Sequence, residues 1–210
     1  MASSIIHIAV AKELNKRLKR NESEYLIGSI APDIAKIVGI SRNLTHFETD
    51  DTAIPNLDYF LSKYKKDLNN DFVMGYYIHL LTDYFWYKYF YTEIVNENTI
   101  TELDGTQLKL SWEEIRDMIY NDYTNLNIKL IEEYNLDLKV FYNDLPDIEN
   151  IIEEIPMDRL DKLMEKTGLI IENSKLNKAY AFNMEDVRTF IKTCIELTIS
   201  VLEEKELIEK

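Results

Sequence analysis

Residues 72–94 constrain the fold of this chain more than any other segment, because they form its richest apolar stretch. The stretch is long enough to span a bilayer, but it contains His79, Asp83, Lys88 and Glu93, which are costly in lipid. We therefore predict a helix over residues 71–95 that is buried at the centre of a helical bundle. The residues that recur along it at helical spacing are Phe72, Tyr76, His79, Asp83, Trp86 and Phe90.

The composition favours an all-α fold. The chain has 210 residues with only five Gly and four Pro, whereas sheets need more turn residues. Apolar residues make up 46% and charged residues 30%, as in a soluble globular protein. We expect one helical domain over residues 1–210, with a metal-site half (1–95), a polar linker (96–110) with an Asp104-Gly105 turn, and a helical C-terminal half (111–210).

Local signals place the other elements. Ser3 or Ser4 can cap a helix to about residue 20, Ser111 and Glu114 form a capping box for a helix to about 134, and Asn183 can cap a helix over 184–208. Further helices are expected over 25–30, 57–68, 146–154 and 157–166. Residues 21–24 and 39–56 read as loops, and residues 168–181 are ambiguous.

Charge and cysteine content narrow the functional classes. A net charge of -14 argues against non-specific binding to double-stranded nucleic acid or to anionic membranes, although a metal-assisted nucleotide substrate stays open. The single cysteine, Cys194, excludes an internal disulfide and reads as a helix core position. The start of the sequence lacks the pattern of a secretory signal, so we expect a cytoplasmic protein without stable membrane insertion.

The three histidines all fall within the first 83 residues. They are His7, His46 and His79, and the carboxylates of Asp33 and Asp83 lie in neighbouring motifs. His79 and Asp83 are four residues apart, so their side chains meet on one face of a helix. Imidazole and carboxylate are the usual ligands of zinc and related divalent ions. The set predicts a metal site in the N-terminal half.

Each of these residues also has an ordinary structural interpretation. A buried Asp83 could form a His–Asp pair that holds two helices, since an unpaired buried carboxylate costs several kcal/mol in rough terms. His7 could be a satisfied helix histidine, His46 a solvated loop histidine, and Asp33 a cap for a helix over 34–40. The combination, rather than any single member, favours the metal site.

Four motifs follow one another within residues 1–95: His7, Gly28-Ser-Ile-Ala-Pro-Asp33, His46-Phe47 and Gly75-x-x-x-His79-x-x-x-Asp83. Their order resembles the zinc-dependent phospholipase C family, which belongs to an all-α superfamily that also contains single-strand-specific nucleases. The resemblance implies a helical bundle with a polymetal site that activates water against a phosphate ester. It also implies that one metal binds Asp33, His46, His79 and Asp83, that Asp83 bridges to a second metal at His7, and that Asp33 acts as ligand or base.

The chain departs from the secreted members of that family in one respect. Those members have a third metal site built from two histidines and a glutamate further along, and no histidine follows His79 here. A carboxylate-rich substitute could come from Glu48, Asp50 and Asp51. Secreted members also use their N-terminal residue as a ligand, and Met1 or Ala2 precedes His7 by a few positions.

Aromatic residues are dense after Gly75. They could line a pocket for a base or an acyl group, or simply fill the core. The residues are Tyr76, Tyr77, Tyr84, Phe85, Trp86, Tyr87, Tyr89, Phe90 and Tyr91.

Together these features predict a cytoplasmic, metal-dependent hydrolase that resembles a phospholipase C-type phosphodiesterase. We expect one or two ions of zinc or another divalent metal, and a small phosphate ester or a lipid headgroup as substrate. A non-catalytic, metal-stabilised binding protein and a metal-free helical scaffold are the rivals. An HD-type phosphohydrolase lacks support, because no adjacent His-Asp pair occurs in the sequence.

Overall fold

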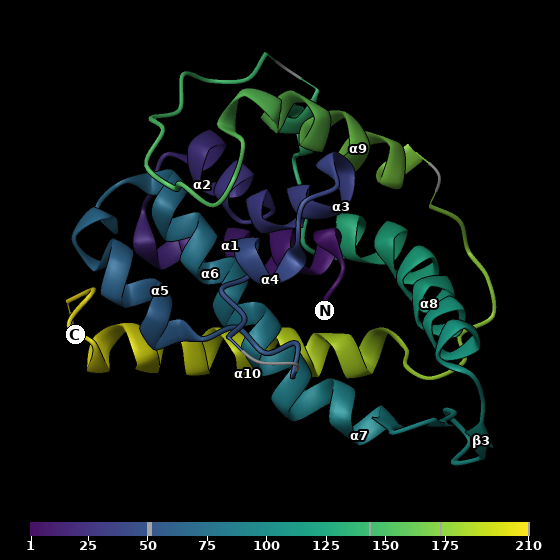
Figure 1. The fold of residues 1–210 in the computed structure, drawn as a ribbon. Coiled ribbons are helices and arrows are strands. Elements are labelled where there is room, and N and C mark those ends of the chain that lie inside the picture. Colours follow the sequence, from purple (N-terminus) through teal and green to yellow (C-terminus); the bar gives the residue numbers. More distant parts are fainter. Residues whose placement is uncertain (50–51, 143, 173, 210) are drawn as a thin grey trace.

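The structure is a computed structural model that describes residues 1–49, 52–142, 144–172 and 174–209, and it is largely helical, as predicted (Figure 1). The longer helices are α1 (Ser4–Leu18), α2 (Glu22–Gly28), α5 (Leu57–Tyr64), α6 (Asp71–Trp86), α8 (Trp112–Glu133), α9 (Leu160–Glu172) and α10 (Met184–Glu204). Short helices are α3 (Ala35–Val38), α4 (Arg42–Thr45) and α7 (Thr92–Ile94). The 3-10 helices are η1 (Ala31–Ile34), η2 (Lys65–Asp67), η4 (Leu138–Phe141) and η5 (Met157–Arg159), and η3 (Tyr87–Tyr91) is π-helical.

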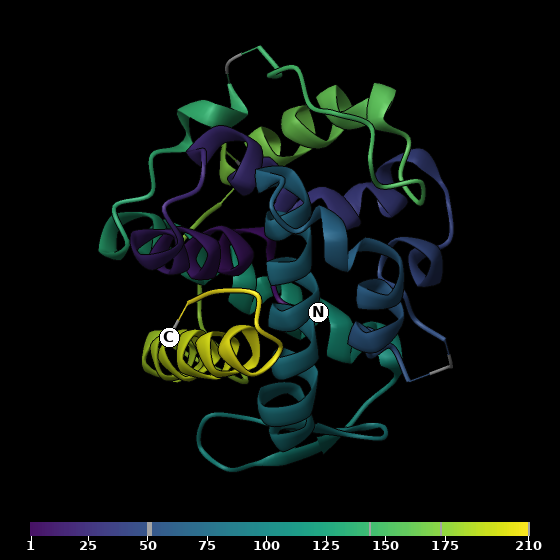
Figure 2. The same ribbon diagram turned by 90° about the vertical axis from the view of Figure 1, so that its left-hand side faces the viewer.

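Helix α6 lies at the centre of the fold. Every residue from Phe72 to Trp86 except Tyr84 is buried, so the helix is enclosed on nearly all sides. Figure 2 shows it upright in the middle, with α1 and α10 on one side and α5 on the other. The Asn70 side chain starts the helix by accepting a hydrogen bond from the Val73 amide. The predicted central buried helix is confirmed, although it passes into η3 at Tyr87 and ends with α7.

A small sheet replaces the linker that the sequence predicted over residues 96–110. Strands β1 (Val95–Asn96), β2 (Thr99–Thr101) and β3 (Gln107–Lys109) pair antiparallel in the order β1-β2-β3. Ile100 pairs with Leu108 and is fully buried, between two threonines that favour extended backbone. The predicted turn is present, with Gly105 at φ 87°.

Caps were predicted more reliably than helix limits. Ser3, the Ser111–Glu114 box and Asn183 cap α1, α8 and α10 as expected. Asn21 caps α2 within the predicted loop 21–24, and α4 lies inside the predicted loop 39–56.

The helix expected over residues 146–154 is wrong, because no helix forms in this stretch. Tertiary contacts hold it instead. Ile152 is fully buried, and the Glu154 carboxylate accepts a hydrogen bond from the Tyr64 hydroxyl at 2.6 Å and pairs with Lys63. These contacts with α5, rather than the local helical periodicity, therefore determine the conformation of the segment.

Two glycines allow α2 and α6 to cross at backbone contact. A Cβ atom on Gly75 would lie 2.1 Å from the Tyr25 carbonyl oxygen, and one on Gly28 would lie 2.2 Å from that of Phe72. The sequence predicted that Gly75 makes room for another backbone or a ligand, and the occupant is the backbone of α2.

Replacing Gly75 with alanine should therefore destabilise the fold by about 3 kcal/mol, because two backbones must move apart. Gly168→Ala is the matched control. It also adds a methyl group to a helix, but the nearest atom belongs to the Tyr142 ring at 3.2 Å, so its change should stay within about 1 kcal/mol. Urea unfolding of both variants measures their free energies of unfolding, and equal values would contradict the close crossing.

Cys194 lies in the core of α10, as predicted. Burial raises the pKa of its thiol to about 12, and its sulfur lies 4.0 Å from the hydroxyls of Thr82 and Thr198. A buried thiol with a raised pKa is a poor nucleophile.

We therefore expect Cys194 to be unreactive in the native protein at neutral pH. A chromogenic disulfide reagent should release one equivalent of product only after denaturant is added. Rapid release by the native chain would show that α10 opens readily.

Among the described residues, none of the helices combines the length and the apolar character needed to cross a membrane.

Candidate metal centre

Helix α6 contributes two of the five predicted site residues. His79 and Asp83 lie one helical turn apart and are buried, with His79 Nε2 3.6 Å from Asp83 Oδ2. The backbone N–H of Ala2 donates to Asp83 Oδ1 at 3.0 Å. Burial alone would raise the pKa of Asp83, but the facing His7 and His79 rings lower it well below its usual range.

Helix α1 brings His7 against this pair. Its ring stacks on His79 with the centroids 3.7 Å apart and the planes 8° from parallel. His7 Nε2 lies 3.2 Å from Asp83 Oδ1, and Nδ1 has no hydrogen-bond partner among the described residues. Burial, together with the neighbouring His79, lowers the pKa of His7 and so favours the neutral ring. His7 is therefore not the satisfied helix histidine of the structural alternative.

His46 completes the group of imidazoles at the end of α4. It is fully buried, which excludes the solvated loop histidine, and burial together with the Arg42 charge holds its pKa well below the usual range. Phe47 follows with φ 55°, and its buried ring packs edge-on against Phe60 at 5.0 Å. This reversal of the chain packs Phe47 into the core next to the buried His46 ring.

Hydrogen bonds made by Nδ1 fix the tautomers of His79 and His46. His79 Nδ1 lies 2.8 Å from the Ser29 carbonyl oxygen, which can only accept, so Nδ1 carries the proton. The Thr45 hydroxyl donates to the Arg42 carbonyl and therefore accepts from His46 Nδ1 at 2.9 Å. In the neutral form of each of these two rings, Nε2 therefore has the lone pair.

These two lone pairs face each other. His46 Nε2 and His79 Nε2 are 3.2 Å apart, and each lies 3.6 Å from Asp83 Oδ2. When both rings are neutral, no proton lies between the two nitrogens. A tetrahedral zinc with Zn–N bonds of 2.0–2.1 Å would separate its two nitrogen ligands by about 3.3 Å. The spacing of the rings therefore fits a shared divalent ion.

Asp33 lies at the more open edge of the cluster. Its side chain is 13% exposed, and Oδ1 is 3.9 Å from His46 Nε2 and 3.8 Å from Lys36 Nζ. It does not cap α3, which has no side-chain cap, so that alternative is wrong. Two overlapping triads result: His7, His79 and Asp83, and Asp33, His46 and His79, each with ligand atoms within 4.8 Å of one another. All five predicted residues thus come together, and their role as ligands stays a prediction.

Sequence reasoning missed the cation of this cluster. Arg42 Nη2 donates to Asp83 Oδ2 at 3.1 Å, and Nη1 pairs with Glu48. Glu48, predicted as part of a substitute third metal site, thus serves as a partner of Arg42. Its companions in that prediction, Asp50 and Asp51, lie outside the described residues. The position of Arg42, one turn before His46, was the available signal.

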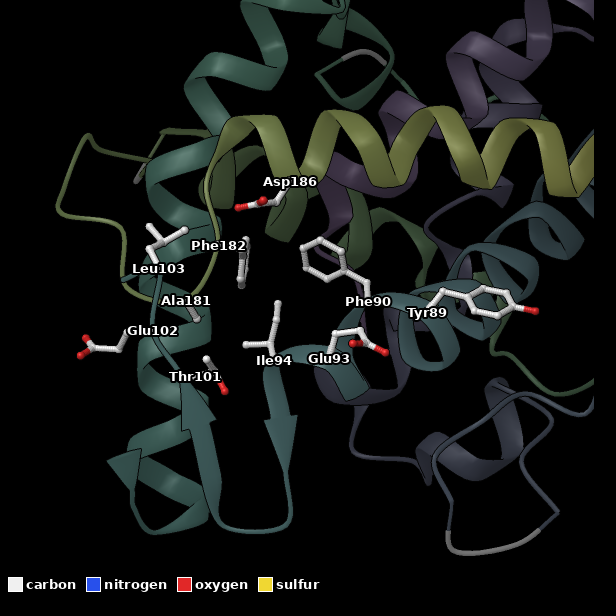
Figure 3. A pocket seen from close by; sticks show the side chains of 10 residues that line it. All are labelled: Tyr89, Phe90, Glu93, Ile94, Thr101, Glu102, Leu103, Ala181, Phe182 and Asp186. Carbon is white, nitrogen blue, oxygen red and sulfur yellow. The ribbon is translucent and has the colours of Figure 1, made fainter. Parts of the chain in front are cut away.

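The aromatic residues after Gly75 mostly fill the core. Tyr76, Tyr77, Phe85 and Trp86 are buried, whereas Tyr89 and Phe90 border a cavity of about 310 Å³ (Figure 3). The remaining lining comes from Glu93, Ile94, Thr101, Glu102, Leu103, Ala181, Phe182 and Asp186. None of the five predicted site residues lines this cavity, so the cavity is separate from the His/Asp cluster.

Comparison with known protein families, with curated proteins and with solved structures finds no match to this chain.

Removal of metal should destabilise the protein. An ion that binds only the folded chain, at a free concentration 100-fold above its dissociation constant, adds about 2.7 kcal/mol, which corresponds to a rise in Tm of roughly 5–10 °C for a chain of this size. Calorimetry before and after chelation measures the change in Tm, and elemental mass spectrometry of the same samples measures their metal content. A chain that neither contains nor takes up a divalent ion would leave the cluster as a structural group.

Proposed function

We propose that the protein is a metal-dependent hydrolase of a phosphate ester, with one or two divalent ions, such as zinc, held by His7, Asp33, His46, His79 and Asp83. The observation that carries this proposal is the pair of Nε2 lone pairs, 3.2 Å apart and flanked by carboxylate oxygens. Such an arrangement is unfavourable without a cation and fits the donor set of catalytic zinc.

The protein's own residues prepare this site. The Ser29 carbonyl and the Thr45 hydroxyl hold the His79 and His46 rings with Nε2 inward, as outer partners of ligating histidines do. The two carboxylate oxygens of Asp83 approach different imidazoles: Oδ1 lies toward His7, and Oδ2 lies toward His46 and His79. Asp83 is therefore suited to bridge two ions.

The ion, once bound, would supply activated water and neutralise charge on the substrate. Asp33 is the carboxylate nearest to solvent in the two triads, so it is the group we assign to accept a proton from water or to complete the ligand set.

The choice of a phosphate ester rests on the resemblance of the motif order to zinc-dependent phospholipases C. The same five residues that the resemblance implies as ligands meet at one place, which supports it. We propose a small phosphate ester or a lipid headgroup as substrate.

A metal-stabilised binding protein without catalysis is the second candidate. The pairing of Glu48 with Arg42 favours it, because that carboxylate is then unavailable for a third ion. In that case the intact protein would contain metal and gain stability from it, but would turn over no phosphodiester.

His79→Ala should lose both metal and hydrolysis, because both triads include His79. We expect at least one equivalent of metal to be lost and the hydrolysis of bis(p-nitrophenyl) phosphate to fall by about 100-fold or more, given the several kcal/mol that a metal contributes. Absorbance assays and elemental analysis measure the two effects.

Thr82→Val is the matched control on the same helix. The Thr82 hydroxyl donates to the Ile78 carbonyl rather than to the cluster, so this variant should keep its metal and its rate. Undiminished hydrolysis by folded His79→Ala protein would refute the proposal.

A further inference from the structure

Arg42 is the one cation in direct contact with the buried carboxylates of the cluster among the described residues. Its guanidinium joins two of them, Asp83 through Nη2 at 3.1 Å and Glu48 through Nη1. The Glu48 side chain is only 3% exposed and that of Asp83 1%, whereas that of Arg42 is 20% exposed. Arg42 is thus the most exposed of these three side chains.

The contact between Arg42 and Asp83 uses the oxygen that the metal would need. Asp83 Oδ2 is 3.1 Å from Arg42 Nη2 and 3.6 Å from the Nε2 atoms of His46 and His79. An ion held by Oδ2 between those rings would compete with Arg42 for this oxygen and weaken that contact. Glu48 would still hold the guanidinium in place.

We infer that Arg42 binds an anionic phosphoryl oxygen of the substrate and becomes free to do so when Asp83 becomes a metal ligand; this inference rests on the proposed function. A guanidinium is permanently charged, and its planar donors match two oxygens of a phosphate. Glu48 acts as a positioning residue, because it keeps the released guanidinium beside the cluster. Lys36, which is 47% exposed and lies 3.8 Å from Asp33, adds a second positive charge at the open edge.

The charges around the cluster predict that phosphate binding depends on metal. Burial lowers the pKa of the nearby Met1 amine, so we count it as neutral. Three carboxylates (Asp33, Glu48 and Asp83) then face two cations (Lys36 and Arg42), so with neutral histidines the group carries a net charge of -3 + 2 = -1. One divalent ion would change it to +1. Anion binding should therefore require metal, in a protein whose total charge is otherwise -14.

The test is the affinity of inorganic phosphate for the full-length, metal-loaded protein, measured by titration calorimetry. Arg42→Met should keep its metal, since a competitor for Asp83 is removed, and should bind phosphate about 10- to 100-fold more weakly. The wild-type protein stripped of metal should bind phosphate more weakly than the loaded protein. Elemental analysis of each sample reports its metal content.

Two further variants sharpen the result. Arg17→Met removes an arginine of α1 that pairs with Glu203, away from the cluster, and should leave phosphate binding unchanged. Arg42→Lys keeps the charge but not the planar donors, so it should bind phosphate with intermediate affinity. It replaces Arg42→Met in the test if that variant does not fold.

The outcomes separate this inference from the proposed function. Loaded Arg42→Met or Arg42→Lys protein that binds phosphate as tightly as the wild type would overturn the inference and leave Arg42 a structural counter-ion of Asp83. Loaded wild-type protein without phosphate affinity would overturn it as well. Weaker phosphate binding by loaded Arg42→Met, in a protein that hydrolyses no phosphodiester, would support the inference and remove the proposed catalysis.

Discussion

The arrangement of the N-terminal half depends on one buried carboxylate. Asp83 is 1% exposed, and a charge at such a position is costly unless it is paired and hydrogen-bonded. Its partners come from two other segments: the Ala2 amide and His7 at the start of the chain, and Arg42 on α4. Neutralising this charge thus requires α1, α4 and α6 to meet at one point.

The crossing of α2 and α6 connects this packing to the chemistry of the site. Gly28 and Gly75 let the two backbones touch, and Ser29 directly follows Gly28 while His79 lies one turn after Gly75. The Ser29 carbonyl can therefore accept a hydrogen bond from His79 Nδ1 at 2.8 Å, which leaves the lone pair of the neutral ring on Nε2. A larger residue at either glycine would disturb the orientation of the His79 ring as well as the stability of the fold.

The sequence was informative where a feature is local or periodic, and uninformative where it depends on tertiary contacts. Apolar spacing identified α6, capping residues identified the starts of α1, α8 and α10, and the spacing of His79 and Asp83 placed them on one face. The α4 helix spans four residues and has no side-chain cap, so the position of Arg42, one turn before His46, was the only local sign of its contact with Asp83. The helix predicted over residues 146–154 is absent for the related reason that tertiary contacts decide the path of this segment: Ile152 is buried, and Glu154 bonds to Tyr64 of α5.

A structural His–Asp pair and a metal centre differ in how donors and acceptors balance. In a structural pair each acceptor meets a proton. Here, with neutral rings, two imidazole lone pairs and the oxygen Asp83 Oδ2 converge, and among the described residues only the Arg42 N–H donates to them. That donor reaches Oδ2 and neither ring nitrogen, so acceptors outnumber donors, which is the balance that a bound cation would satisfy. Arg42 Nη2 compensates the charge of Asp83, and the second contact of its guanidinium, with Glu48, fixes it beside the cluster.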